Sequence, residues 1–237
     1  MTHRNRGCSK TRLVLACVAS VLTAGASALV AQHLREEVGA GRLATYRVTV
    51  TNLTPGQVFS PPLVVTHPRG GRLFAVAQPA SDGLVLLAED GDGSLLAAEA
   101  VASGAVATAS AAGPVPPGTA VEIEVEGRPN GDVSVAGMLV NTNDSFFALN
   151  GARLPRGRFE SSSWRVPSYD AGSEENNEDC DFIPGPACAG AGAGVRAPAG
   201  AEGFVFIGNG VHGIADLLPE ETDWRNPVAM IMIERIR

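Results

Sequence analysis

The sequence predicts an all-β protein, an antiparallel β-sandwich with one or two short helices inserted in a crossover. Three observations support this fold class: at least five separated segments resemble strands, clusters of Pro and Gly separate them, and helical spacing is confined to one stretch. The chain has 237 residues, is 45% hydrophobic and carries a net charge of −7. This balance excludes global disorder and a chain-wide basic surface for nucleic acid.

Hydrophobic periodicity places the strands. Apolar and polar residues alternate at 46–51 and 121–126, which predicts strands with one buried face, and the second places three glutamates on its solvent side. Residues 133–140 are apolar nearly throughout, which predicts a strand buried on both faces. The segment 162–166 and the apolar runs at 204–207 and 229–236 are expected to supply the remaining strands.

The helical stretch begins after Ser81, a suitable N-cap, and continues with Leu84 and Leu87. A second apolar group at 95–98 follows the turn Asp90-Gly91-Asp92-Gly93. This turn does not match an EF-hand loop, because Leu95 stands where that loop requires glycine. We therefore expect one or two short helices joined by a simple turn.

The N-terminus predicts a secretory signal peptide over residues 1–28. Residues 1–12 contain four basic residues and no acid, residues 13–31 carry no charge, and Ala26-Ser27-Ala28 is a small-x-small cleavage site. An uncleaved membrane anchor is the alternative, since nineteen uncharged positions can just span a bilayer core. Cleavage lowers the net charge from −7 to −11 and predicts a secreted, periplasmic or extracellular protein, with a linker at 29–44 and one domain at 45–237.

After cleavage, Cys180 and Cys188 are the cysteines that remain. In an exported protein such a pair predicts a disulfide, because oxidising compartments preserve these bonds. A metal site would need further Cys or His ligands, and none is adjacent in the sequence.

The sequence offers little support for an enzyme, and we expect no catalytic residues. It contains no Gly-x-Ser-x-Gly motif and no phosphate-binding loop with lysine. His33, His67 and His212 lack metal-ligand spacing and are expected to be exposed turn residues. Carboxylate pairs form in space and leave no motif, so an exported hydrolase using a carboxylate pair or a metal-bound water is the alternative.

An acidic segment at 170–179 contains five acids in ten residues. Calcium prefers oxygen ligands, and Asp170 and Glu174 lie four residues apart with Gly172 between them to permit a tight bend. The alternative is a solvated acidic loop.

A second oxygen-rich loop at 141–144 leads toward Asn150. Because loops cluster at the ends of a sandwich, Asp144 or Asn150 could face Asp170 across a cleft. Alternatively, Asn143-Asp144 and Asn150-Gly151 are ordinary turns. Asp132, at the start of the buried strand, is a further candidate oxygen ligand.

Five segments occur in an order that resembles the spondin domain, the N-terminal module of F-spondin and mindin that also occurs as a stand-alone exported bacterial protein. They are residues 46–52 (YRVTVTN), 59–62 (FSPP), 137–146, 170–174 (DAGSE) and 223–229. The resemblance extends over about 44–237, and its most specific part is the Asp-Ala-Gly-(Ser/Thr)-acid motif.

The resemblance implies a β-sandwich related to calcium-dependent membrane-docking modules, a bound calcium or similar divalent ion, and extracellular adhesion without catalysis. The two acids of the motif fall on Asp170 and Glu174, and the family's third ligand falls near Asn150, with Asp144 slightly earlier. An amide at Asn150 would lower the ligand charge and weaken the site. The implied partner is an extracellular or cell-surface ligand, with no nucleic acid and no membrane contact beyond the signal segment.

Overall fold

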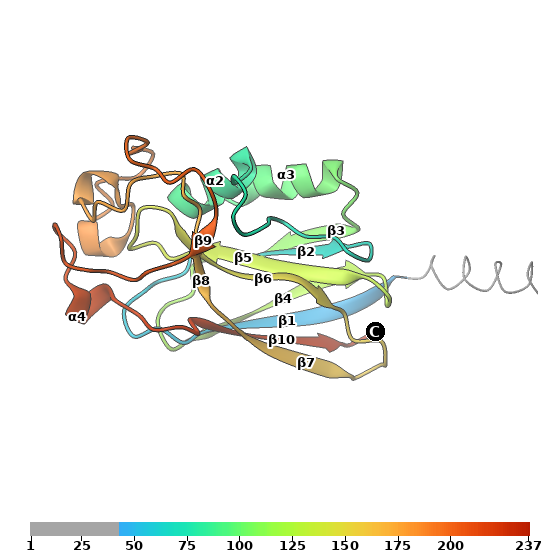
Figure 1. The fold of residues 1–237 in the computed structure, drawn as a ribbon. Helices are drawn as coiled ribbons and strands as arrows, with labels where there is room; N and C mark the ends of the chain where they lie inside the picture. Colours follow the sequence, from blue (N-terminus) through green and yellow to red (C-terminus); the bar gives the residue numbers. More distant parts are fainter. Residues whose placement is uncertain (1–42) are drawn as a thin grey trace, which may run out of the picture. The chain divides into compact units, whose positions relative to one another are not determined.

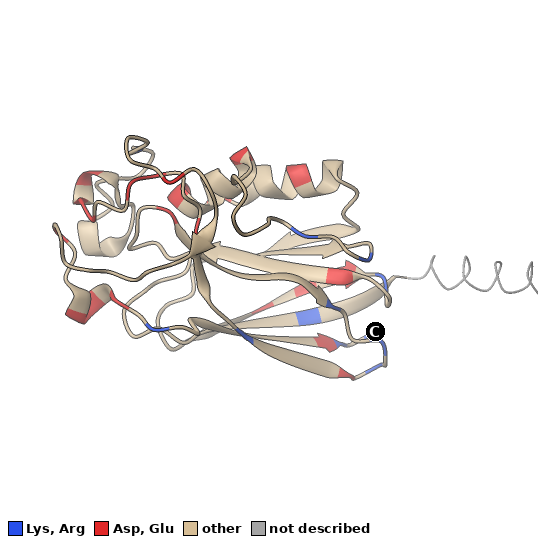
Figure 2. Cartoon of the chain, in the orientation of Figure 1, with Lys and Arg blue, Asp and Glu red and all other residues tan. Residues whose placement is uncertain are grey.

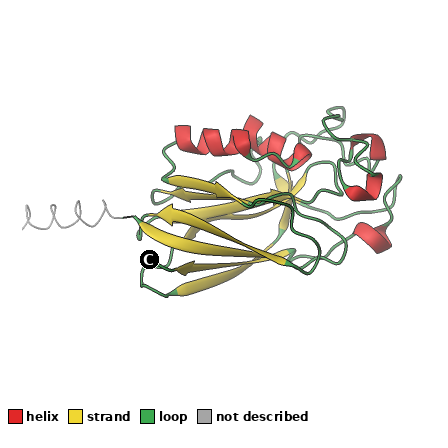
Figure 3. Cartoon of the chain, turned by 180° about the vertical axis from the view of Figure 1, so that it is seen from behind, coloured by secondary structure: helices red, strands yellow, loops and turns green. Residues whose placement is uncertain are grey.

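Two antiparallel sheets face each other in the protein, and a pair of helices covers the outer face of the larger sheet (Figures 1 and 3). The computed structural model describes residues 43–237. The predicted signal segment, residues 29–42 of the expected linker and His33 lie outside the described residues. The arrangement confirms the predicted all-β sandwich with short helices.

The smaller sheet has four strands in the order β4-β1-β10-β7. Their bounds are Ala44–Asn52 (β1), Ala120–Gly127 (β4), Ser161–Val166 (β7) and Ala229–Arg235 (β10). The larger sheet has six strands in the order β3-β2-β5-β6-β8-β9. Their bounds are Leu63–His67 (β2), Ala107–Ser110 (β3), Asp132–Met138 (β5), Ser145–Arg153 (β6), Ser168–Asp170 (β8) and Phe206–Ile207 (β9).

The alternating strands pack as their sequences predict. In β1 the side chains of Tyr46, Val48 and Val50 are fully buried between the sheets, and Tyr46 pairs with Val125 of β4. The three glutamates of β4 are exposed on the other face. Period-two burial of this kind removes one apolar face from water and leaves the other solvated.

Strand β5 is buried along its whole length because both of its faces are covered. Val133 and Val135 belong to the core between the sheets, whereas Ala136 belongs to a second core beneath the helices. The prediction of a strand buried on both faces is therefore confirmed.

The helix layer consists of α2 (Asp82–Asp90) and α3 (Ser94–Ala102). The Ser81 side chain caps α2 by accepting the Leu84 N–H at 3.3 Å, as expected. Gly91 ends α2 in the left-handed conformation with φ +70, so the Asp/Gly segment is a turn between helices. The second core contains Leu84, Leu87 and Leu96, together with Leu63 and Phe146 of the sheet.

Three local expectations are corrected. The strand expected at 204–207 is limited to β9, because Val205 bonds instead to the segment 77–78. Asn150 and Gly151 lie within β6 and are not a hairpin turn. His67 is buried, with its Nε2 3.0 Å from Ser134 Oγ, because the following loop covers it, and burial lowers its pKa.

The two ends of the sandwich differ in charge (Figure 2). Acidic positions gather in the loops around α4 (Pro219–Thr222) and the segment after β8, at one end of the strands. The opposite end, where β1 begins, carries many of the arginines together with acids such as Glu126 and Glu234. The acidic end is also where the oxygen-rich segments identified in the sequence come together.

Candidate metal centre

Paired strands bring two acidic residues together at the acidic end of the larger sheet. Ser145 of β6 pairs with Asp170 of β8, so Asp144 lies beside the residue that follows Asp170. The Ala171 N–H donates to the Asp144 carbonyl at 3.2 Å. Asp144 is fully buried and Asp170 is 2% exposed.

The Asp144 side chain organises the acidic segment after β8. Its Oδ2 accepts hydrogen bonds from the Ser173 N–H at 2.7 Å, the Ser173 hydroxyl at 3.0 Å and the Glu174 N–H at 3.0 Å. Its Oδ1 is buried and has no hydrogen-bond partner within residues 43–237. One carboxylate oxygen therefore shapes the loop while the other is left without a donor.

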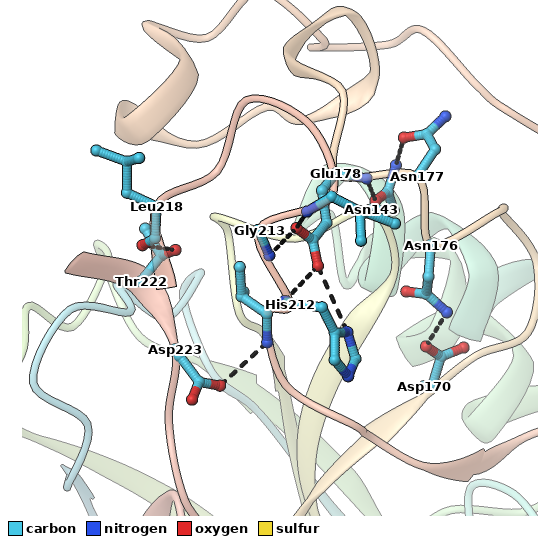
Figure 4. A network of polar contacts seen from close by, with 12 residues as sticks. Asn143, Asp170, Asn176, Asn177, Glu178, His212, Gly213, Leu218, Thr222 and Asp223 are labelled. Carbon is cyan, nitrogen blue, oxygen red and sulfur yellow. Dashed lines mark hydrogen bonds and ion pairs between the residues drawn. The ribbon is translucent and has the colours of Figure 1, made fainter. Parts of the chain in front are cut away.

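Asp170 begins a tight bend. Its Oδ1 accepts the Gly172 N–H at 2.8 Å, and its Oδ2 accepts the Asn176 side-chain amide at 2.8 Å (Figure 4). Gly172 has φ +65, and a Cβ there would lie 2.3 Å from the Phe204 carbonyl oxygen. Only glycine fits this close backbone approach, as the sequence indicated.

Glu174 completes a cluster of three buried carboxylates. It is 1% exposed, and its Oε1 accepts the Ala197 N–H at 2.8 Å. Its Oε2 is buried and lacks a hydrogen-bond partner in the described part of the chain. The Asn143 side chain is nevertheless close enough to lower the Glu174 pKa, so this carboxylate is less isolated than the Asp144 Oδ1.

Burial raises the pKa of all three carboxyl groups, and the charge of Asp144 adds to the rise at Asp170 and at Glu174. Burial raises the pKa of Asp170 to about 8, and the neighbouring charge of Asp144 adds to this rise. Burial likewise raises the pKa of Glu174 to about 7 against the hydrogen bond from Ala197, and Asp144 again contributes. The pKa of Asp144 is also raised, chiefly by burial. Ionising all three is costly unless a positive charge is present.

The oxygen ligands of the cluster are of the type that binds a hard cation, but they are not arranged as a complete coordination site. Among residues 43–237, no three Asp, Glu, His or Cys side chains are gathered as a ready-made metal site. The ligands available are carboxylate and amide oxygens, which calcium prefers. The unpartnered oxygens of Asp144 and Glu174 are buried acceptors of the kind that a cation satisfies.

Asn150 does not belong to this cluster, which corrects the expectation that it is a ligand. Its amide holds the segment after β2, accepting the Leu73 N–H at 2.8 Å and donating to the Phe74 carbonyl at 2.9 Å. Because β6 continues through Asn150, this side chain lies about 20 Å along the strand from Asp144.

Asp132 is also used elsewhere. Its Oδ2 accepts the Gly70 N–H at 2.6 Å, and its Oδ1 lies 3.3 Å from Arg153. Of the sequence-predicted ligands, the structure therefore brings together Asp144, Asp170 and Glu174, and it places Asn150 and Asp132 at the other end of the sandwich.

Glu178, which the sequence did not single out, organises the neighbouring loop. Its carboxylate accepts the backbone N–H groups of His212 at 2.5 Å, Gly213 at 2.7 Å and Ile214 at 2.9 Å (Figure 4). Three donors satisfy this 5% exposed side chain, so its role is structural. The sequence carries no local signal for it, because its donors lie more than thirty residues away.

The predicted disulfide is present next to the acidic segment. Cys180 and Cys188 are bonded, with their Cα atoms 5.0 Å apart. Two single-turn 3₁₀ helices contain them, η1 (Cys180–Phe182) and η2 (Pro186–Cys188). The bridge restrains the connection that follows the carboxylate cluster.

No protein-family model matches the chain, and no curated protein matches it. In residues 43–237, every helix is too short or too polar to cross a membrane.

Proposed function

We propose that the chain is a secreted, non-enzymatic binding module that holds calcium at Asp144, Asp170 and Glu174. The observation that carries the proposal is the pair of buried, unpartnered carboxylate oxygens on Asp144 and Glu174. Buried polar atoms nearly always have a hydrogen-bond or metal partner in native proteins. Two buried carboxylate oxygens without a partner in one acidic cluster therefore suggest a bound cation.

The charge of the cluster also favours a cation. Close like charges repel by on the order of a few kcal/mol per pair at an effective dielectric constant near 20. Protons or a divalent ion can remove this repulsion. The raised pKa values of Asp170 and Glu174 mean that protons compete with calcium near neutral pH, so binding should release protons.

A cation at this position would order the loops of the acidic end. Asp144 already bonds to the loop at Ser173 and Glu174, and Glu174 in turn bonds to Ala197 in the following connection. Arg196 of that connection pairs with Asp90 of α2 at 2.7 Å. Fixing the carboxylates would therefore stabilise a surface formed by three segments, which is suited to binding a partner.

The resemblance to the spondin domain supports the same proposal. The motif 170–174 supplies two of the three carboxylates, and its glycine occupies a position that only glycine fits. Extracellular adhesion to a cell-surface or matrix ligand is the role that this resemblance implies.

The surroundings of the cluster favour binding over the alternative of an exported hydrolase. A hydrolase needs its carboxylates beside a pocket that admits substrate. The carboxylates of Asp144, Asp170 and Glu174 line none of the cavities of about 480, 350 and 20 Å³. Ser134, which contacts His67, is fully buried and accepts the Gly151 N–H, so its hydroxyl is not placed to attack a substrate.

The experiment is calorimetric titration with calcium, combined with thermal melts in calcium and in chelator. We expect a heat of binding and a higher melting temperature in calcium, since a ligand at one hundred times its Kd stabilises by about 2.7 kcal/mol. Asp170→Asn should abolish both effects. Asp181→Asn removes an exposed acid from the same region and should preserve them.

A melting temperature that is the same in calcium and chelator, with no heat of binding, would refute the metal site. Equal losses in Asp170→Asn and Asp181→Asn would instead attribute calcium binding to the general acidity of this end. Turnover of a substrate by the purified protein would refute the non-enzymatic assignment.

A further inference from the structure

A cavity lies at the opposite end of the molecule from the carboxylate cluster and shares no residue with it. A cavity of about 480 Å³ opens between the loop 68–73 and α3. The loop contributes Arg69 and Arg72, and His67 of β2 lines the cavity beside them. Its α3 side is formed by Leu96, Ala100 and Ser103. This volume is within the range of small-molecule sites.

The arginine-bearing loop is held in place by side chains from the sheet. Asp132 of β5 accepts the Gly70 N–H at 2.6 Å, and Asn150 of β6 bonds to both Leu73 and Phe74. Gly71 packs directly on His67, where an added Cβ would lie 2.3 Å from the His67 Cβ. The loop is therefore preorganised, which lowers the entropy cost of binding a ligand.

Neither arginine of the loop has a carboxylate partner. Within the described residues, no Asp or Glu lies within ion-pair distance of Arg69 or Arg72, although five other arginines form ion pairs. Both side chains are exposed. Two unpaired guanidinium groups at the mouth of a cavity form a site for an anion, since each offers a planar fork of donors to a carboxylate or phosphate.

The acidic residue that lines this cavity, Glu99, already has hydrogen-bond partners. Glu99 accepts the Ser81 hydroxyl at 2.6 Å and the Gly83 N–H at 2.8 Å, so its charge is directed to the N-terminus of α2. The surrounding end of the sandwich carries both basic and acidic positions (Figure 2). Arg153 also lies at this end, but it pairs with Asp132 at 3.3 Å, so the unpaired positive charge at the cavity belongs to Arg69 and Arg72. These two arginines make the cavity locally positive although the whole chain is acidic.

We propose that this cavity binds a small organic anion, a phosphate ester or carboxylate with an apolar body. Arg69 and Arg72 bind the anionic group. Leu73, Leu96 and Ala100 supply the apolar wall against which the rest of the ligand packs. Asp132 and Asn150, which the sequence suggested as calcium ligands, act here as positioning residues for the loop.

The test uses phenyl phosphate as the probe. Phenol and inorganic phosphate are the controls, because each contains only the apolar or only the anionic part of the probe. Each is titrated into the ¹⁵N-labelled protein while the amide resonances of Gly70, Gly71 and Ser103 are followed. We expect phenyl phosphate to shift these resonances at concentrations at least tenfold lower than either half requires. Arg69→Gln combined with Arg72→Gln should weaken its affinity at least tenfold. Arg128→Gln, an exposed arginine outside the cavity, and Arg165→Gln on β7 should change it less than twofold.

The site is overturned if phenyl phosphate leaves these resonances unmoved, or if it binds the double variant as tightly as the wild type. An equal loss in Arg128→Gln would also overturn it, because general electrostatic attraction would then explain the binding. Equal affinity for inorganic phosphate would overturn the role of the apolar wall. None of these outcomes depends on calcium, and the titrations are performed without added calcium, chelator or other polycarboxylate.

Discussion

The carboxylate of Asp144 accepts the backbone N–H of Glu174 at 3.0 Å, across thirty residues of sequence. One buried acid thus fixes the position of another. The contact forms because Asp144 ends the turn before β6, and β6 pairs with β8, from which the acidic segment departs. Repulsion between the two carboxylates is therefore built into the backbone geometry.

Asp144→Asn should have opposite effects with and without calcium. The amide oxygen can keep the hydrogen bonds to Ser173 and Glu174 while the variant loses one of three clustered charges. In chelator at pH 8 we expect stability to rise by about 1 kcal/mol or more, because like-charge repulsion falls. The stabilisation by calcium should disappear. Urea denaturation in chelator and in calcium measures both effects, and a variant that responds to calcium like the wild type would contradict the assignment.

Without divalent cations, stability should fall as the pH rises from about 4 to about 8. Unfolded Asp170 and Glu174 release their protons near pH 4, whereas burial raises their native pKa values to about 8 and about 7. Between these limits the native state binds more protons than the unfolded state, so raising the pH favours unfolding. Denaturation in chelator at pH 5 and pH 8 tests this.

Calcium should reduce that pH dependence, because it stabilises the ionised carboxylates. Asp170→Asn should reduce it as well, by removing one titrating group. Greater stability at pH 8 than at pH 5 in chelator would show that the cluster does not control the pH response.

Asn150→Ala should leave the calcium response unchanged. Its side chain binds Leu73 and Phe74, not the carboxylate cluster. Losing these two hydrogen bonds should destabilise the protein by about 1–3 kcal/mol and increase hydrogen exchange at Leu73. Calcium calorimetry beside Asp144→Asn provides the comparison, and a large loss of calcium affinity in Asn150→Ala would restore Asn150 as a ligand.

Glu178→Ala should destabilise the protein by about 1.5–3 kcal/mol or more, because it leaves the N–H groups of residues 212–214 without their charged acceptor. Glu175→Ala is the matched control, since Glu175 is an exposed acid three residues earlier. Chemical denaturation of the two variants should separate them clearly. Equal stabilities would show that the loop finds other acceptors.

Reduction of the disulfide should loosen its loop before the sandwich unfolds. A bridge that closes so short a loop stabilises by about 2–3 kcal/mol on the chain-entropy model. We expect Cys180→Ser combined with Cys188→Ser to increase hydrogen exchange at 179–192, while the amides of β1 and β5 stay protected. Cooperative loss of protection in those strands after mild reduction would contradict this expectation.

Much of the fold follows from local pattern. A few consecutive residues are enough to predict several elements from their periodicity or capping. These are the strands at 44–52, 120–127 and 229–235, the Ser81 cap and the buried strand β5. His67 was missed because its burial comes from a loop that folds back over it, which no local pattern encodes.

The chemistry of the candidate site divides in the same way. Residue type and spacing alone identified the acids of the motif 170–174, the glycine between them and the cysteine pair. The identity of the third residue in the cluster depended on strand pairing. The register of β6 with β8 places Asp144 beside the motif, whereas Asn150 lies at the opposite end of β6. Side chains far apart in sequence meet only through the register of a sheet, and long-range hydrogen bonding determines that register.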